Sequence, residues 1–234
     1  MRATHTRLLS LSIVLALGAC RPAGDAAPAP APAEPAPPAA DPAPPAASEP
    51  IVATFRCGDL QVGTTFDNAA GNVNLSINGS LRPLPQAPSA SGARYADDAG
   101  NEFWNKGDGA TLTLDGASHE CHKTDEVSPW DAARARGVVF RAVGNEPGWL
   151  VEVEGGDLPV LRAQLDMGTR TVEAGQVERT ADGFSGTTAD GVAVVLTATG
   201  DGCVDGMSGQ GFPASAELAV GDERFKGCGA FLDR

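Results

Sequence analysis

Short runs of alternating apolar and polar residues begin at residue 51 and continue to the end of the chain. They include IVATFRC, LQVGTTF, NVNLSI, EFWNK and ATLTL, then GVVFRAV, WLVEVE, VAVVLTAT and AELAV. Turn-forming segments rich in Gly, Asn and Asp, such as DNAAGN and TADG, separate these runs. No stretch shows the period of an amphipathic helix. The pattern therefore predicts an all-β chain of antiparallel barrels or sandwiches.

A polar segment divides this β-rich region. Residues 122–137, HKTDEVSPWDAARARG, lack strand alternation. We interpret residues 123–135 as a linker between two small domains, residues 51–122 and residues 136–234.

The first twenty residues have the form of an export signal. Basic residues precede an apolar run from Leu8 to Leu17, which is too short to span a bilayer. The run ends in LALGAC, which resembles a bacterial lipobox with Cys20 as the acylated residue. Acyl chains would hold the protein to a membrane. Arg21 in place of an aspartate favours the outer membrane, by resemblance to sorted lipoproteins. The alternative is an ordinary signal peptide that ends near a cysteine.

Residues 21–50 consist mainly of Ala and Pro. Such a composition cannot bury a core, and proline removes backbone donors. We expect a disordered, extended tether of about 3.1 Å per residue, up to roughly 90 Å long.

Four cysteines remain once Cys20 is set aside, and three pairings of them are possible. Pairing within each domain needs no crossing, so we predict the disulfides Cys57–Cys121 and Cys203–Cys228. Closing the first loop would contribute on the order of 4 kcal/mol, which a domain of that size needs.

Two short polar motifs lie in the first domain. They are SASGARY at residues 89–95 and FWNKGDGATL at residues 103–112. Together with FRCG and HECH they resemble the MliC/PliC-type inhibitors of c-type lysozyme, which are bacterial lipoproteins of the periplasm and outer membrane. The resemblance covers residues ~51–122 and implies an inhibitor with no catalytic activity of its own.

The resemblance also implies which residues bind lysozyme. Ser91 and Lys106 would enter its cleft, and Tyr95 would support the first loop. Gly92 and Gly107 would allow sharp turns and close approach. The cleft holds two catalytic carboxylates, so a lysine ammonium suits it, and a serine hydroxyl can donate to or accept from either protonation state.

Each motif also has a simpler interpretation. Ser91 can form a local turn, and Lys106 can be a solvated loop lysine. We expect the aromatic residues Tyr95, Phe103 and Trp104 to pack in the core or against the loops. The segment RYADDAGNEFW is slightly long between the motifs, which would shift the two loops relative to each other.

The charge balance is acidic throughout. The chain has a formal net charge of -13. Residues 51–122 hold four basic and eight acidic residues, and residues 134–234 hold nine and fifteen. An acidic surface steers a basic partner such as lysozyme and repels nucleic acid. It also confers solubility without any partner.

The second domain contains FRAVGNEPGWLVEVEGG and CVDGMSGQG. These segments resemble an uncharacterised family of bacterial envelope domains over residues ~136–232, with no activity to carry over. Glu146, Asp205 and Ser208, with Trp149 nearby, are candidates for a small pocket. The alternatives are that Glu146 caps a turn and that Trp149 packs inside a barrel. We also expect Met207 to fill the core.

Catalytic and metal chemistry find little support in the sequence. GMSGQG lacks the final glycine of a nucleophile elbow, and no histidine follows His122. His119 and His122 flank Cys121, but they would face opposite sides of a strand. We therefore expect no metal, no cofactor and no enzyme. The rival functions are small-ligand or metal binding by the second domain, and an envelope scaffold.

Overall fold

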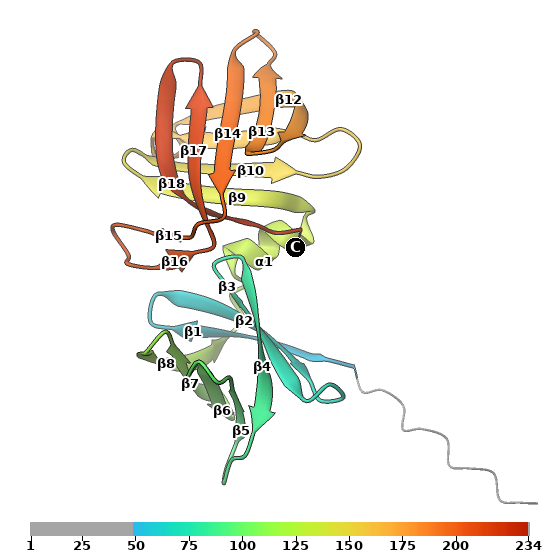
Figure 1. The fold of residues 1–234 in the computed structure, drawn as a ribbon, viewed down its shortest axis with the longest axis vertical. Coiled ribbons are helices and arrows are strands. Elements are labelled where there is room, and N and C mark those ends of the chain that lie inside the picture. The colour runs from blue at the N-terminus through green and yellow to red at the C-terminus, as the bar shows by residue number, and fades with distance from the viewer. Residues whose placement is uncertain (1–48, 234) are drawn as a thin grey trace, which may run out of the picture. The chain divides into compact units, whose positions relative to one another are not determined.

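The computed structural model describes residues 49–233, and β-strands dominate them. Two closed antiparallel barrels follow one another along the chain (Figure 1). This confirms the prediction of an all-β protein with two small domains. The export signal, Cys20 and almost all of the Ala/Pro segment lie outside the described residues. Within those residues, no helix has the length and apolar character needed to cross a membrane.

Eight strands form the first barrel in sequence order. They are β1 (Ile51–Cys57), β2 (Leu60–Asp67), β3 (Asn72–Ile77), β4 (Ser80–Ala87), β5 (Ala93–Ala96), β6 (Glu102–Lys106), β7 (Gly109–Leu114) and β8 (Ala117–Thr124). The barrel closes where β1 pairs with β8, with Cys57 opposite Cys121. These two cysteines form the predicted disulfide.

Alternation along the strands builds the core of this barrel. On β2, Val62, Thr64 and Phe66 point inward, whereas the residues between them are half-buried. The rings of Phe55 and Phe103 meet inside with their centroids 5.2 Å apart. Full burial of one such side chain contributes about 1.5–3 kcal/mol, so the interior supplies much of the stability of this barrel.

Strand β4 was not among the predicted runs because it contains Pro83 and Pro85. Both prolines lie in the part of β4 that pairs with β3. Among the residues of β4, only the last two, Gln86 and Ala87, pair with β5. Proline lacks a backbone N–H and is tolerated where a strand has a neighbour on one side only. Pro83 and Pro85 lie in the part of β4 that β5 does not reach, so they meet this condition.

The second barrel has the strand order β10-β11-β12-β13-β14-β17-β18-β9. Its strands are β9 (Val138–Asn145), β10 (Gly148–Glu154), β11 (Leu161–Leu165), β12 (Arg170–Thr180), β13 (Gly183–Thr188), β14 (Ala193–Thr199), β17 (Ala214–Val220) and β18 (Glu223–Phe231). A 3-10 turn, η1 (Asp166–Gly168), precedes β12. Strands β15 (Cys203–Val204) and β16 (Gly211–Phe212) form a separate ribbon. The predicted disulfide Cys203–Cys228 joins this ribbon to β18.

A helix, α1 (Pro129–Ala135), lies in the segment that we interpreted as a linker. The sequence showed no helical period in this segment. Ser128 caps the helix, since its Oγ accepts a hydrogen bond from the backbone N–H of Trp130 at 3.2 Å. Pro129 occupies the first turn, and Gly137 follows the last turn at φ +84°. A helix of seven residues is too short for a period to be visible, but its start and stop residues were readable.

Helix α1 contacts residues that precede it and residues that follow it in the sequence. Trp130 and Ala133 are buried in a cluster with Val138, Ala230 and Leu232. The Arg134 guanidinium donates to the carbonyl of Gly79 at 2.8 Å and to that of Leu232 at 3.2 Å. The helix is therefore part of the packed structure.

Candidate functional site

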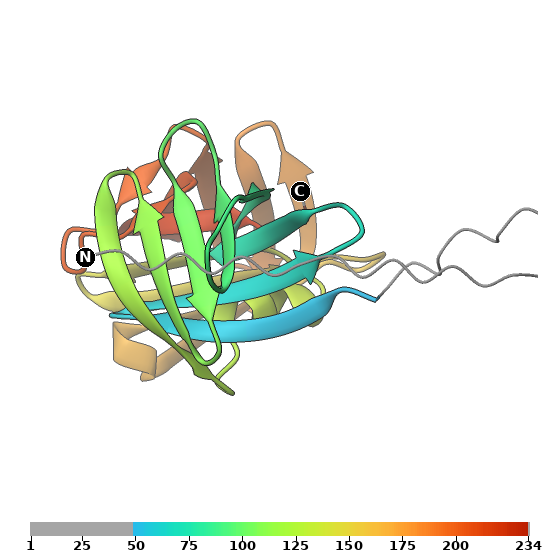
Figure 2. The ribbon, with the colours of Figure 1, turned by 90° about the horizontal axis from the view of Figure 1, so that it is seen from below.

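The two motifs of the first domain meet at one end of its barrel. Ser91 lies in the loop between β4 and β5, and Lys106 is the last residue of β6. Strands β5 and β6 are paired with Ala93 opposite Asn105, so the loop and the β6–β7 turn emerge side by side. The β4–β5 loop projects at the lower end of the barrel in Figure 1, and Figure 2 views the molecule from that side.

Gly92 is the point of contact between the two segments. It has φ +71°, a conformation that favours glycine. A Cβ atom there would collide with the backbone oxygen of Asn105 and lie 3.3 Å from the Cβ of Lys106. The absence of a side chain therefore lets the loop rest directly on β6. Gly107 also has a positive φ, +63°, but open space surrounds it.

A hydrogen bond joins the loop to β6. The indole N–H of Trp104 donates to the carbonyl oxygen of Ser91 at 2.9 Å. The hydroxyl of Ser89 donates to the same oxygen at 2.6 Å. These bonds occupy the backbone of Ser91, and its own hydroxyl has no partner among residues 49–233. That hydroxyl remains exposed and available to a binding partner.

Lys106 is exposed and differs from the arginines of the same barrel. Each arginine has an acidic partner, in the pairs Arg56–Glu126, Arg82–Asp115 and Arg94–Glu102. Lys106 makes no ion pair within the part of the chain that the structure describes. Its ammonium group is therefore available to an external anion.

Tyr95 and Phe103 lie inside the barrel. Tyr95 is only 4% exposed, and its ring lies 5.7 Å from that of Phe66. Burial raises the pKa of the Tyr95 hydroxyl. Because side chains alternate along β6, Phe103 points inward and Trp104 outward. The expectation that these aromatics pack in the core or against a loop is confirmed.

The long connection between the motifs is accommodated away from Ser91 and Lys106. Residues 97–101 form the β5–β6 turn at the opposite end of this hairpin. The Asp97 carboxylate accepts hydrogen bonds from the backbone N–H of Asn101 at 2.9 Å and from its side chain at 2.8 Å. These bonds lower the pKa of Asp97. The extra length therefore leaves the β5–β6 register beside the site continuous.

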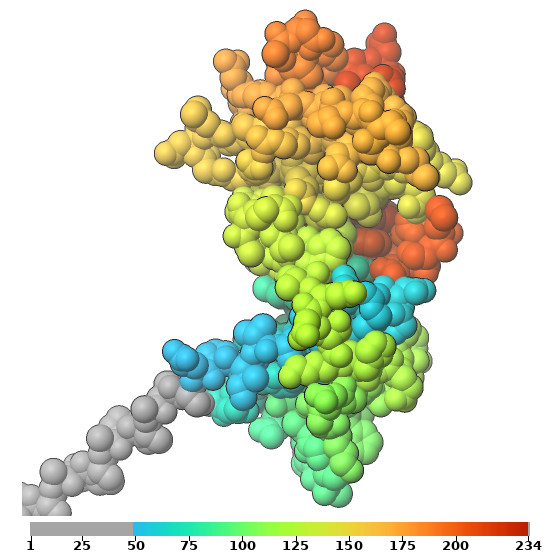
Figure 3. Space-filling view, turned by 180° about the vertical axis from the view of Figure 1, so that it is seen from behind, coloured from blue at the N-terminus to red at the C-terminus, as the bar shows by residue number. Residues whose placement is uncertain are grey.

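The surface at this end is uneven. A hollow of about 410 Å³ lies next to the loop and is lined by residues 86–89 with Gly92 and Arg94. In the space-filling view, the green end of the first barrel projects from the rest of the surface (Figure 3). A projecting end can enter a concave partner.

In the second barrel, two of the four pocket candidates line a hollow. Glu146 and Asp205 face an opening of about 500 Å³, together with Asn145, Lys226 and the Cys203–Cys228 pair. Trp149 does not line it. Its ring is buried in the core, and its N–H donates to the carbonyl of Lys226 at 3.1 Å.

The Asp205 carboxylate is engaged within its own turn. It accepts hydrogen bonds from the backbone N–H and the hydroxyl of Ser208, both at 2.7 Å, and from the side chain of Asn145. The bonds from Ser208 are the main reason that the pKa of Asp205 is lowered. Met207 in the same turn is 76% exposed, so the expectation that it fills the core is wrong. Its neighbours in the turn are exposed as well, which leaves no interior for it to fill.

Trp104 is the residue whose specific contact the sequence did not indicate. Its outward direction follows from the alternation on β6, but its bond to Ser91 depends on the folded loop. Residues 49–233 contain no cluster of three or more His, Cys, Asp or Glu side chains suited to a metal ion.

The similarity of this chain to known proteins lies in the first barrel. Residues 55–120 match the family model of the membrane-bound lysozyme inhibitors of c-type lysozyme. A curated protein from Yersinia enterocolitica, named "Membrane-bound lysozyme inhibitor of C-type lysozyme", is 36% identical over 61 residues. The alignment covers 26% of this chain and 51% of the relative, so the chain spans about half of its length. No solved structure matches the chain significantly.

Proposed function

We propose that the first barrel binds and inhibits a c-type lysozyme, and that the Ser91 loop and Lys106 enter the catalytic cleft. The observation that carries this proposal is the family match over residues 55–120, which includes both loops. The adjacency of the two loops through Gly92 adds support, since one cleft could receive both.

The proposed mechanism is occlusion of the cleft. The cleft of a c-type lysozyme contains two carboxyl groups, one protonated and one ionised. The ammonium group of Lys106 has no ion pair with residues 49–233 to break before it approaches them. The hydroxyl of Ser91 can donate to an ionised carboxylate or accept from a protonated one. The barrel itself performs no chemical step.

We further propose that Cys20 is lipid-anchored in the outer membrane and that the barrels extend into the periplasm on the Ala/Pro tether. The Yersinia relative is named as a membrane-bound inhibitor. An inhibitor at that position would protect peptidoglycan from lysozyme that crosses the outer membrane.

Lys106→Ala tests the mechanism. We expect it to raise the inhibition constant against a c-type lysozyme about 30-fold, because a buried interfacial charge contributes about 2 kcal/mol. The measurement is lysis of bacterial cell walls by the enzyme at increasing concentrations of protein. Lys226→Ala is the matched control, since Lys226 is an exposed lysine of the second barrel.

The two parts of the proposal fail in different ways. A wild-type protein that leaves every c-type lysozyme active overturns the function. Full inhibition by Lys106→Ala overturns the role of the lysine and leaves the function standing.

A further inference from the structure

Trp104 occupies an unusual position for a tryptophan of this protein. The other two, Trp130 and Trp149, are buried, whereas Trp104 is 41% exposed. Its N–H is nevertheless engaged, because it donates to the carbonyl of Ser91. An exposed indole that bonds a loop thirteen residues away in sequence restrains that loop.

The loop has few other restraints. Residues 88–92 are all exposed. The bond from Ser89 to Ser91 lies within the loop, and no other side chain from elsewhere in residues 49–233 hydrogen-bonds to residues 88–92. Gly92 provides a steric contact with β6, but it has no side chain with which to fix the direction of Ser91. The Trp104 bond is therefore the polar tie between the loop and the strand that ends in Lys106.

We infer that Trp104 is a positioning residue that holds the Ser91 hydroxyl in place beside Lys106. The expected effect on inhibition rests on the proposed function. The restraint of the loop does not, because it is a property of the free protein. A loop that is ordered before binding loses less conformational freedom when it enters a cleft. Without the tie, the loop would have to be ordered at the moment of binding.

Trp104→Phe removes the N–H donor and keeps an aromatic ring. In the free variant we expect lower backbone order parameters for residues 89–92, measured by ¹⁵N relaxation, and unchanged values for strands β5 and β6. Leu81→Ala is the control, since Leu81 is an exposed apolar residue at the start of β4. Equal order parameters in the wild-type protein and Trp104→Phe would overturn the inference, whether or not the protein inhibits lysozyme.

A double-mutant cycle then links position to inhibition. We expect Trp104→Phe to raise the inhibition constant about tenfold in the wild-type background. In the Ser91→Ala background the same change should have less than a twofold effect, because no hydroxyl remains to be positioned. Equal losses in both backgrounds would show that Trp104 acts independently of Ser91 and would overturn the inference. If the wild-type protein does not inhibit the enzyme, that result overturns the proposed function instead.

Discussion

Gly92 allows the loop that carries Ser91 to lie against the strand that carries Lys106. Two separate requirements meet at this residue, a left-handed backbone and the nearby carbonyl of Asn105. Gly71 shares only the first requirement, since it has φ +64° and open space around it. A comparison of substitutions at Gly92 and Gly71 therefore distinguishes the cost of a left-handed backbone from the cost of a steric clash with a neighbouring strand.

Gly92→Ala should weaken inhibition at least tenfold, because the new methyl group pushes the loop away from β6. It should also lower the free energy of unfolding by more than the 1–2 kcal/mol expected from a left-handed alanine alone. Gly71→Ala should show the strain cost and normal inhibition. Both quantities are measurable by urea unfolding and by the lysis assay. Identical behaviour of the two variants would contradict the close-approach argument.

The first barrel depends on the closure between its first and last strands. Cys57 and Cys121 are opposite each other where β1 pairs with β8, and 64 residues separate them along the chain. A barrel has no free edge only while this seam is closed. The disulfide favours the closed barrel because it reduces the conformational freedom of the unfolded chain.

Replacing both Cys57 and Cys121 with alanine should lower the free energy of unfolding of the first barrel by about 4 kcal/mol. The Cys203/Cys228 pair closes only 25 residues, so its removal should cost less, about 3.5 kcal/mol. Urea denaturation monitored by tryptophan fluorescence measures both losses. A larger loss from the second pair would indicate that native-state packing, and not loop length, sets the contribution of these disulfides.

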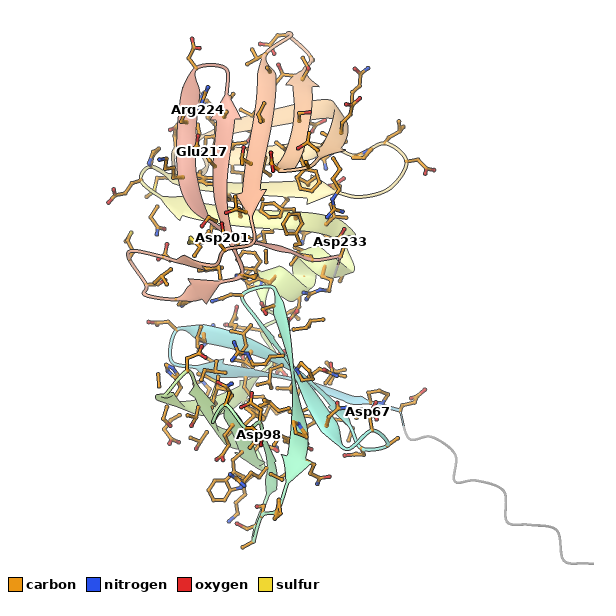
Figure 4. All side chains as sticks on the ribbon, viewed as in Figure 1. Asp67, Asp98, Asp201, Glu217, Arg224 and Asp233 are labelled. Atoms are coloured by element: carbon orange, nitrogen blue, oxygen red, sulfur yellow. A yellow bond between two sulfur atoms is a disulfide. The ribbon has the colours of Figure 1, made fainter. Side chains whose placement is uncertain are left out.

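Acidic residues occur on the surfaces of both barrels. Figure 4 labels Asp98 in the first barrel and Asp201 in the second, and both side chains are exposed. With a formal net charge of -13, the chain would attract the basic partner of the proposed function through solvent. Under the proposed function, Lys106 would then meet a partner that the acidic surface has attracted.

The association rate with a c-type lysozyme should therefore fall about tenfold between low salt and about 0.5 M salt, while the dissociation rate changes less. Surface plasmon resonance at several salt concentrations gives both rates. An association rate that does not respond to salt would mean that the acidic surface contributes only solubility.

The sequence alone determined the features that depend on local alternation and on turn residues. Strands such as β2, β6 and β10 are visible because each buried residue is followed by a more exposed one. The two disulfides followed from the division into two domains, and the two loops from their motifs. The strands β4, with its prolines, and β5, with only four residues, carry no such pattern.

Tertiary structure decided what depends on neighbours distant in sequence. The β5–β6 register places Ser91 beside Lys106, and the folded loop brings the Ser91 carbonyl to Trp104. The exposure of Met207 likewise depends on a turn that is closed by Asp205. A linear pattern records which face of a strand a side chain occupies, but it does not record which loop lies across that face. That information exists only once the barrel has closed.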